Sequence, residues 1–255
     1  MKYFKSLLII LVLIGANIFH AAGQNTKRMP VIVELFTSEG CSTCPPADKF
    51  LQKLVEEQPI SGVEIIGLSE HVDYWNRLGW TDRFSSAQFS NRQGYYLTFF
   101  KNSQIYTPQM VVDGTRELSG KAAEKTLADA AKNPKGNLDL KIEKQAGNIL
   151  SFKIKIADLP KISDNDKAVV LLAITENDLT SNVSAGENSG RMLKHTAVTR
   201  YLKNIGGITG EKTELSIDVE LVKDWKRENL SAIAFVQEAN SRRILGAAKI
   251  SLKNP

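Results

Sequence analysis

The sequence has few residues that could hold a metal and no concentration of charge of one sign. Its 255 residues include two cysteines and three histidines, namely Cys41, Cys44, His20, His71 and His195. A zinc site takes about four such ligands. Acidic and basic residues are interleaved without a run of five like charges, and the formal net charge is +5. The sequence therefore disfavours a metal site, and it lacks the basic patch of a nucleic-acid-binding protein.

Long apolar stretches are also scarce, and the one clear run lies at the N-terminus. Lys2 and Lys5 precede the apolar residues 7–14, and the small residues 21–23 follow. This order is typical of a secretory signal peptide, which we predict at 1–23, and it implies export to the periplasm or the extracellular space. The alternative is an uncleaved membrane anchor, although polar residues interrupt the run before the roughly 18 apolar residues that a span needs. After cleavage we expect no association with membranes.

The pattern of apolar residues predicts two domains, 24–134 and 135–255. In the first, the apolar run 31–36 indicates a buried strand. Residues 47–55 have the apolar spacing of an amphipathic helix, and 63–68 indicate a second strand. The order strand, helix, strand is that of a βαβ unit.

The rest of the chain changes in character twice. Residues 70–102 are polar and aromatic, and we expect a helix within them. The pair Asp113-Gly114 indicates a β-hairpin, and a last helix is expected up to about residue 131. Beyond Gly136 apolar and polar residues alternate, so the second domain is expected to be mostly β-structure, arranged as a small sandwich.

Cys41 and Cys44 form the most informative motif, Cys-Ser-Thr-Cys, between the first predicted strand and the first predicted helix. Two cysteines at this spacing can close and reopen a small disulfide. The positive end of a helix dipole lowers the pKa of a thiol, so Cys41 is the expected nucleophile, accessible to solvent, and Cys44 the resolving thiol. Pro45 and Pro46 weaken this expectation, because proline lacks an amide hydrogen and disfavours helical geometry in the preceding residue. A purely structural disulfide is the alternative.

Three stretches of the first domain resemble a known family. They read VELFTSEGCSTCPPAD, HVDYWNRLGW and YTPQMVVDG, and a weaker echo, GENSGRMLKH, occurs in the second domain. They are similar to a family of secreted bacterial thioredoxin-like proteins of unassigned function, DUF1223, within the thioredoxin superfamily. The resemblance implies an α/β thioredoxin-like N-terminal domain with inserted helices, followed by a mostly β, sandwich-like C-terminal domain. It implies the activity only loosely, because one fold hosts many functions.

The resemblance also implies a substrate-binding loop at Thr107-Pro108. These residues stand in the place of the cis-proline loop, which lies against the disulfide in the thioredoxin fold. The backbone of Thr107 would then contact an extended substrate. The alternative is an ordinary trans proline at the start of a strand.

Three further residues are candidates for proton transfer or for tuning the thiols. His71 and Asp73 follow the second predicted strand, at the end of the sheet where ligands of open α/β folds bind. Glu39 lies two residues before the motif. A histidine at a strand end is more often a hydrogen-bond partner that anchors a loop, so a structural role stays open. In the second domain, four residues without an evident reactive partner are interpreted as loop residues: Glu187, Asn188, Arg191 and His195.

These features predict an exported thiol–disulfide oxidoreductase with the redox pair Cys41 and Cys44. Its substrates would be cysteine-containing proteins or small thiols, and it would need no cofactor besides its own disulfide and no metal. One alternative is a non-catalytic binding module with an inert disulfide on a thioredoxin frame. Another is a thiol peroxidase, although no residue pattern marks a peroxide pocket.

Overall fold

The computed structural model describes residues 28–101 and 104–253. The predicted signal peptide, 1–23, lies outside the described residues. Across the two described ranges, no helix is both long enough and apolar enough to span a membrane.

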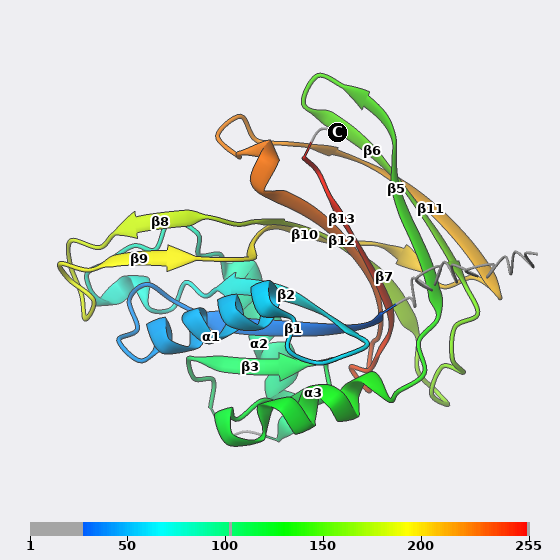
Figure 1. The fold of residues 1–255 in the computed structure, drawn as a ribbon, viewed down its shortest axis with the longest axis horizontal. Coiled ribbons are helices and arrows are strands. Elements are labelled where there is room, and N and C mark those ends of the chain that lie inside the picture. The colour runs from blue at the N-terminus through cyan, green and yellow to red at the C-terminus, as the bar shows by residue number, and fades with distance from the viewer. Residues whose placement is uncertain (1–27, 102–103, 254–255) are drawn as a thin grey trace, which may run out of the picture.

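A mixed eight-stranded sheet forms the centre of the fold (Figure 1). Its strands follow the order β13-β12-β7-β10-β2-β1-β3-β4. Their bounds are β1 (Met29–Thr37), β2 (Val63–His71), β3 (Gln109–Val112), β4 (Arg116–Glu117), β7 (Ala168–Glu176), β10 (Val198–Gly207), β12 (Leu230–Glu238) and β13 (Ile244–Ser251). The parallel pair β1 and β2 runs in register from Met29 opposite Val63 to Thr37 opposite His71. The loops that follow these two strands therefore leave the sheet at the same edge.

Three α-helices cover the two faces of this part of the sheet (Figure 1). They are α1 (Cys44–Glu57), α2 (Ala87–Phe100) and α3 (Ala123–Ala131), and three short 3-10 helices are η1 (Asn76–Leu78), η2 (Gly120–Ala122) and η3 (Arg227–Asn229). Because side chains of a strand alternate between faces, Val33 of β1 packs in one core with α1 and α3, whereas Ile32 packs in another with α2. The βαβ unit and the later helices expected from the sequence are present.

The helix α2 is also held to the sheet by buried charge. Arg92 of α2 forms ion pairs with Glu34 of β1 and Glu70 of β2, both of which are fully buried. The hydroxyl of Tyr96 donates to Glu34 as well. Breaking a buried pair on one side leaves an uncompensated charge, so these contacts fix where α2 and the loop before it lie.

The C-terminal half forms a β-sandwich that shares the large sheet. Its separate layer has the strand order β11-β6-β5, with β5 (Asn137–Ala146), β6 (Ile149–Ala157) and β11 (Lys212–Glu220). Apolar side chains of this layer pack against β7, β12 and β13 of the large sheet. The sandwich-like second half expected from the sequence is therefore present, but one of its two layers continues into the sheet of the first half.

The two halves join where β10 pairs in parallel with β2. Val198 lies opposite Ser69, and the Ser69 N–H donates to the carbonyl of Ala197 at 2.7 Å. A strand edge with unpaired backbone groups is a template for another strand, and the second half supplies that strand. Sequence periodicity gives the faces of a strand but not its neighbours, which explains why this junction was not expected.

A two-stranded hairpin completes the fold. It consists of β8 (Leu179–Asn182) and β9 (Met192–His195), joined by residues 183–191. The hairpin lies beside the N-terminal end of α1 (Figure 1). It brings residues of the second half to the Cys-Ser-Thr-Cys motif.

Candidate functional site

The two cysteines lie at the junction of β1 and α1 and form a disulfide. Cys44 is the first residue of α1, Cys41 lies in the loop before it, and their Cα atoms are 5.4 Å apart. The first turn of α1 contains Pro45 and Pro46, which proline geometry allows at this end of a helix. Cys41 therefore precedes the helix rather than belonging to its first turn.

Both cysteines are buried, with exposed fractions of 0%. The sulfur of Cys41 lies 3.3 Å from the hydroxyl of Thr43 and 3.8 Å from the carbonyl oxygen of Thr107. The expectation that Cys41 is accessible to solvent is thus wrong for this structure. The covering residues come from loops far apart in the sequence, which a local motif does not reveal.

The peptide bond between Thr107 and Pro108 is cis, as the family resemblance implies. It directly precedes β3, and the carbonyl of Thr107 faces the disulfide. The indole N–H of Trp75 donates to the hydroxyl of Thr107 at 2.8 Å and fixes the loop from the other side. The structure therefore brings Thr107 and Pro108 together with the cysteine pair.

The loop of the β8–β9 hairpin clamps the motif. The buried side chain of Asn188 donates to the carbonyl oxygens of Glu39 and Cys41, at 2.8 and 2.9 Å. Arg191 in turn donates to the side-chain oxygen of Asn188. Next to it, a carboxylate oxygen of Glu187 accepts hydrogen bonds from the backbone and the hydroxyl of Ser42, at 2.9 and 2.7 Å.

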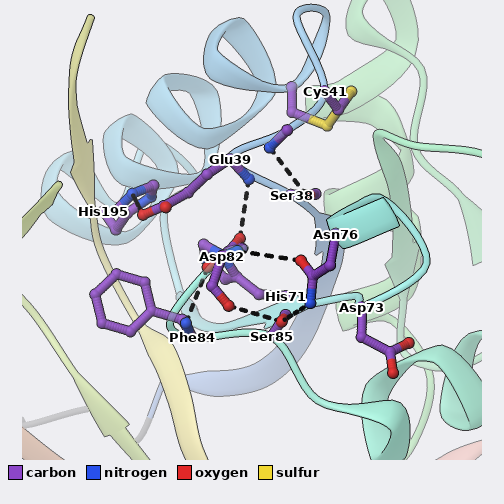
Figure 2. A network of polar contacts seen from close by, with 12 residues as sticks. Ser38, Glu39, Cys41, His71, Asp73, Asn76, Asp82, Phe84, Ser85 and His195 are labelled. Carbon is purple, nitrogen blue, oxygen red and sulfur yellow. Dashed lines mark hydrogen bonds and ion pairs between the residues drawn. A yellow bond between two sulfur atoms is a disulfide. The ribbon is translucent and has the colours of Figure 1, made fainter. Parts of the chain in front are cut away.

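Beneath the motif lies a buried set of paired acids and histidines (Figure 2). His71 Nδ1 lies 2.7 Å from an oxygen of Asp82, and His195 Nε2 lies 3.1 Å from an oxygen of Glu39. The indole of Trp80 donates to the other oxygen of Glu39 at 2.7 Å. The two pairs are linked, because the backbone N–H of Glu39 donates to Asp82 at 2.9 Å.

The two histidine rings also contact each other. Their centroids are 5.0 Å apart in an edge-to-face arrangement, and Phe84 packs against both rings. Neither His71 Nε2 nor His195 Nδ1 has a hydrogen-bond partner among the described residues, and the same holds for a buried oxygen of Asp48 in α1. Buried polar atoms normally have partners, so this set is unusual for a purely structural core.

Charge pairing sets the protonation of this set. Burial opposes charge on His71, but the Asp82 carboxylate outweighs it and raises the pKa of the imidazole. Burial likewise opposes charge on Asp82, yet His71 lowers the pKa of this carboxyl. Burial also opposes charge on Glu39, while its hydrogen bond with His195 and further bonds lower its pKa. For Asp48, burial dominates and raises the pKa.

The structure separates the three residues expected to tune the thiols. Glu39 and His71 belong to the buried set, but Asp73 points away from it (Figure 2). Its carboxylate accepts a hydrogen bond from the hydroxyl of Ser90 at 2.5 Å, on α2. The partner of His71 is Asp82, a residue that no motif of the sequence marks.

Several residues of the site were missed from the sequence. Glu187, Asn188 and Arg191 do lie in a loop, as expected, and His195 ends β9, but all four lie at the motif or beneath it. They belong to the stretch GENSGRMLKH, whose resemblance to the family is weak. Within the described ranges, no group of three or more histidine, cysteine or acidic side chains is arranged to hold a metal ion.

Comparisons with known proteins agree with this fold. The family described as Protein of unknown function (DUF1223) matches residues 32–237. A crystal structure of a protein from Agrobacterium tumefaciens is similar at 26% identity, with a TM-score of 0.69 over 88% of this chain and 95% of that one. The HBP35 protein of Porphyromonas gingivalis shares the fold at 15% identity, with a TM-score of 0.62 over 88% of this chain and 75% of that one. No curated protein matches the chain.

Proposed function

Because the chain belongs to the DUF1223 family, whose function is unassigned, we propose a function from its own site: thiol–disulfide exchange by Cys41 and Cys44 on a thioredoxin-like frame. One observation carries the proposal. The sulfur of Cys41 lies 3.8 Å from the carbonyl of Thr107, on a cis Thr107-Pro108 bond that comes from a different part of the chain. A turn staple needs only its two cysteines, whereas exchange needs a backbone group beside the sulfur to hold a partner.

The chemistry of the step is an exchange of sulfur partners. A partner thiolate attacks the sulfur of Cys41, the bond between Cys41 and Cys44 breaks, and Cys44 leaves as a thiolate. In the second half-reaction a second thiolate of the partner attacks the partner's sulfur in this mixed disulfide, Cys41 leaves as a thiolate with the bonding electron pair, and the partner departs as a disulfide while the chain holds two thiols. The reverse sequence reduces a partner disulfide. The substrate is a cysteine-containing protein or a small thiol, and export to an oxidising compartment fits such chemistry.

Exposed apolar side chains around the motif favour a polypeptide partner. Leu78, Ile105 and Tyr106 are large apolar residues with exposed fractions of 51%, 39% and 46%. Ile105 and Tyr106 directly precede Thr107 in the sequence. Leu78 lies in the segment between Trp75, which bonds Thr107, and Trp80, which bonds Glu39. Single exposed apolar residues are ordinary, but Ile105 and Tyr106 are adjacent and exposed directly before Thr107, a place where apolar contact with a polypeptide is favourable.

Exchange requires that the covering residues move, because both sulfurs are buried. The loop 183–191 is the segment best placed to move, since it bonds the motif only through Glu187 and Asn188. The same burial favours the second candidate function, a binding module whose disulfide is inert. The two differ in whether thiols of ordinary reactivity reach Cys41.

The test is equilibration of the disulfide in glutathione buffers, followed by mass spectrometry after acid quenching and alkylation. Exchange predicts that the bond opens and closes within minutes and that its reduction potential lies above about −300 mV, because structural disulfides typically have potentials below that value. The binding-module alternative predicts that the native protein stays oxidised until it is unfolded. A variant with Cys41→Ser serves as the matched control, because it retains one thiol and cannot form the bond.

A further inference from the structure

The start of α1 offers few amides to an anion on Cys41. Reduction of the disulfide leaves a thiol whose ionised form gains from unpaired N–H groups at a helix N-terminus. In this chain Pro45 and Pro46 of the first turn have no amide hydrogen. The N–H of Cys44 donates to the carbonyl of Cys41 at 3.2 Å.

The donors of Ser42 are occupied as well. Its N–H and its hydroxyl both donate to the same carboxylate oxygen of Glu187. These two hydrogen bonds lower the pKa of Glu187, so this carboxylate is charged at neutral pH. The negative charge of Glu187 is therefore held against Ser42, the residue next to Cys41, and a like charge disfavours a thiolate.

The other ionisable groups near the motif are paired elsewhere or disfavoured as ions, and burial raises the pKa of Asp48 on α1 and so favours its neutral form. Glu39 is paired with His195 and bonded by Trp80, and Arg191 donates to a side chain of its own loop. Glu187 is thus the carboxylate that bonds directly between the two cysteines.

On the basis of the proposed exchange function, we propose that Glu187 is a positioning residue that stabilises the Cys41–Cys44 disulfide relative to the dithiol. Glu187 occupies the two hydrogen-bond donors of Ser42, which then cannot bond the Cys41 sulfur, and its negative charge repels the Cys41 thiolate. Both effects destabilise the thiolate and leave the neutral disulfide unaffected. The reduced protein is then a stronger electron donor than it would be without Glu187, which favours electron flow from this chain to its substrate.

In that direction the substrate is a polypeptide or small-molecule disulfide. The Cys41 thiolate attacks it and forms a mixed disulfide, releasing one substrate thiolate. Cys44 then attacks Cys41, so the chain ends with its own disulfide and the substrate as two thiols, two electrons having been transferred. A second dithiol donor returns the chain to its reduced form.

The experiment measures the equilibrium constant between the full-length protein and dithiothreitol, for wild type and three variants. Glu187→Gln removes the charge and keeps a hydrogen-bond acceptor, whereas Glu187→Ala removes both. Glu211→Gln is the matched control, because Glu211 is exposed and lies in the connection between β10 and β11. The pKa of Cys41 in each reduced protein is followed by thiolate absorbance.

We expect Glu187→Ala to lower the constant for disulfide formation by about two- to tenfold, with Glu187→Gln between it and wild type. Tenfold corresponds to about 30 mV for a two-electron couple. The pKa of Cys41 should fall in the same order, and Glu211→Gln should leave both quantities unchanged. Unchanged values for Glu187→Ala, or an equal change for Glu211→Gln, overturn the inference.

This equilibrium separates failure of the inference from failure of the proposed function. Dithiothreitol, given enough time, equilibrates with a structural disulfide as well as with a reactive one. Slow exchange with glutathione together with a shifted constant would refute the function and leave the tuning effect standing. Fast exchange with glutathione together with an unshifted equilibrium constant would support the proposed function and refute the effect of Glu187.

Discussion

Replacing Asn188 by alanine is the perturbation that the structure predicts most sharply. The side chain is fully buried and donates to the carbonyl oxygens of Glu39 and Cys41. The Cys41 oxygen keeps a second donor, the N–H of Cys44 at 3.2 Å, whereas no other donor among the described residues bonds the Glu39 oxygen. Losing one net hydrogen bond costs about 0.5–1.5 kcal/mol and orphaning a buried carbonyl about 1–3 kcal/mol.

The expected loss in the free energy of unfolding is therefore about 1.5–4.5 kcal/mol. For a chain of this size, each kcal/mol lowers the melting temperature by about 2–4 °C. Urea unfolding gives the free energy, and hydrogen exchange of residues 183–191 shows whether the loss is local. Reduction of the disulfide by dithiothreitol should also become faster, because the clamp over Cys41 is weakened.

Asn182→Ala is the matched control, since Asn182 lies on β8 of the same hairpin and is exposed. It should change stability by less than about 0.5 kcal/mol. The reasoning is refuted if Asn188→Ala is as stable as wild type, or if the two variants lose equal amounts. A loss of stability without faster reduction would show that the loop does not cover the disulfide.

Two further predictions concern the buried pairs and the backbone. Because the pKa of Asp82 is lowered in the folded protein, its pairing with His71 adds to the free energy of unfolding above about pH 4, the pKa of aspartate in the unfolded chain. Because the pKa of His71 is raised, the stability that its protonation adds is complete below about pH 6.5 and is lost as the pH rises through the pKa of the folded protein. Asp82→Asn should thus cost most stability between about pH 4 and 6.5, by urea unfolding at several pH values; a flat difference would contradict the pairing. Gly114→Ala should prevent folding or strongly destabilise the fold, because at φ +71° the new Cβ would lie 2.9 Å from the carbonyl carbon of Arg242. Gly147 also has a positive φ, +58°, but open space around it, so Gly147→Ala should lower the free energy of unfolding by only about 1 kcal/mol. Thermal melting of both variants measures the difference. Equal losses for the two glycine variants would contradict this account.

Much of the first half could be predicted from local patterns. The strand 31–36, the helix from residue 47 and the strand 63–68 follow from apolar spacing, and the structure contains all three within longer elements. The cis bond at Thr107-Pro108 followed from the family resemblance alone, because most X-Pro bonds are trans.

The remainder depends on contacts that have no local signature. Val198 pairs with Ser69 across more than a hundred residues, and this pairing places His195 beside His71. The burial of Cys41 follows from the same arrangement, because Asn188 lies in the hairpin that this junction positions. A histidine or asparagine in a loop gives no sign of the partner that the fold will bring to it.

The proposed function requires that Cys41 exchanges partners and that Cys44 resolves the product. Its most direct test is trapping with a cysteine-containing peptide activated as a mixed disulfide, comparing Cys44→Ser with Cys41→Ser by mass spectrometry. We expect the native Cys44→Ser protein to accumulate a peptide adduct on Cys41, because the sulfur of Cys41 lies beside the carbonyl of Thr107. Cys41→Ser, which has lost that sulfur, should react at least about tenfold more slowly. Equal trapping by both variants, or none by either until the protein unfolds, would contradict the claim.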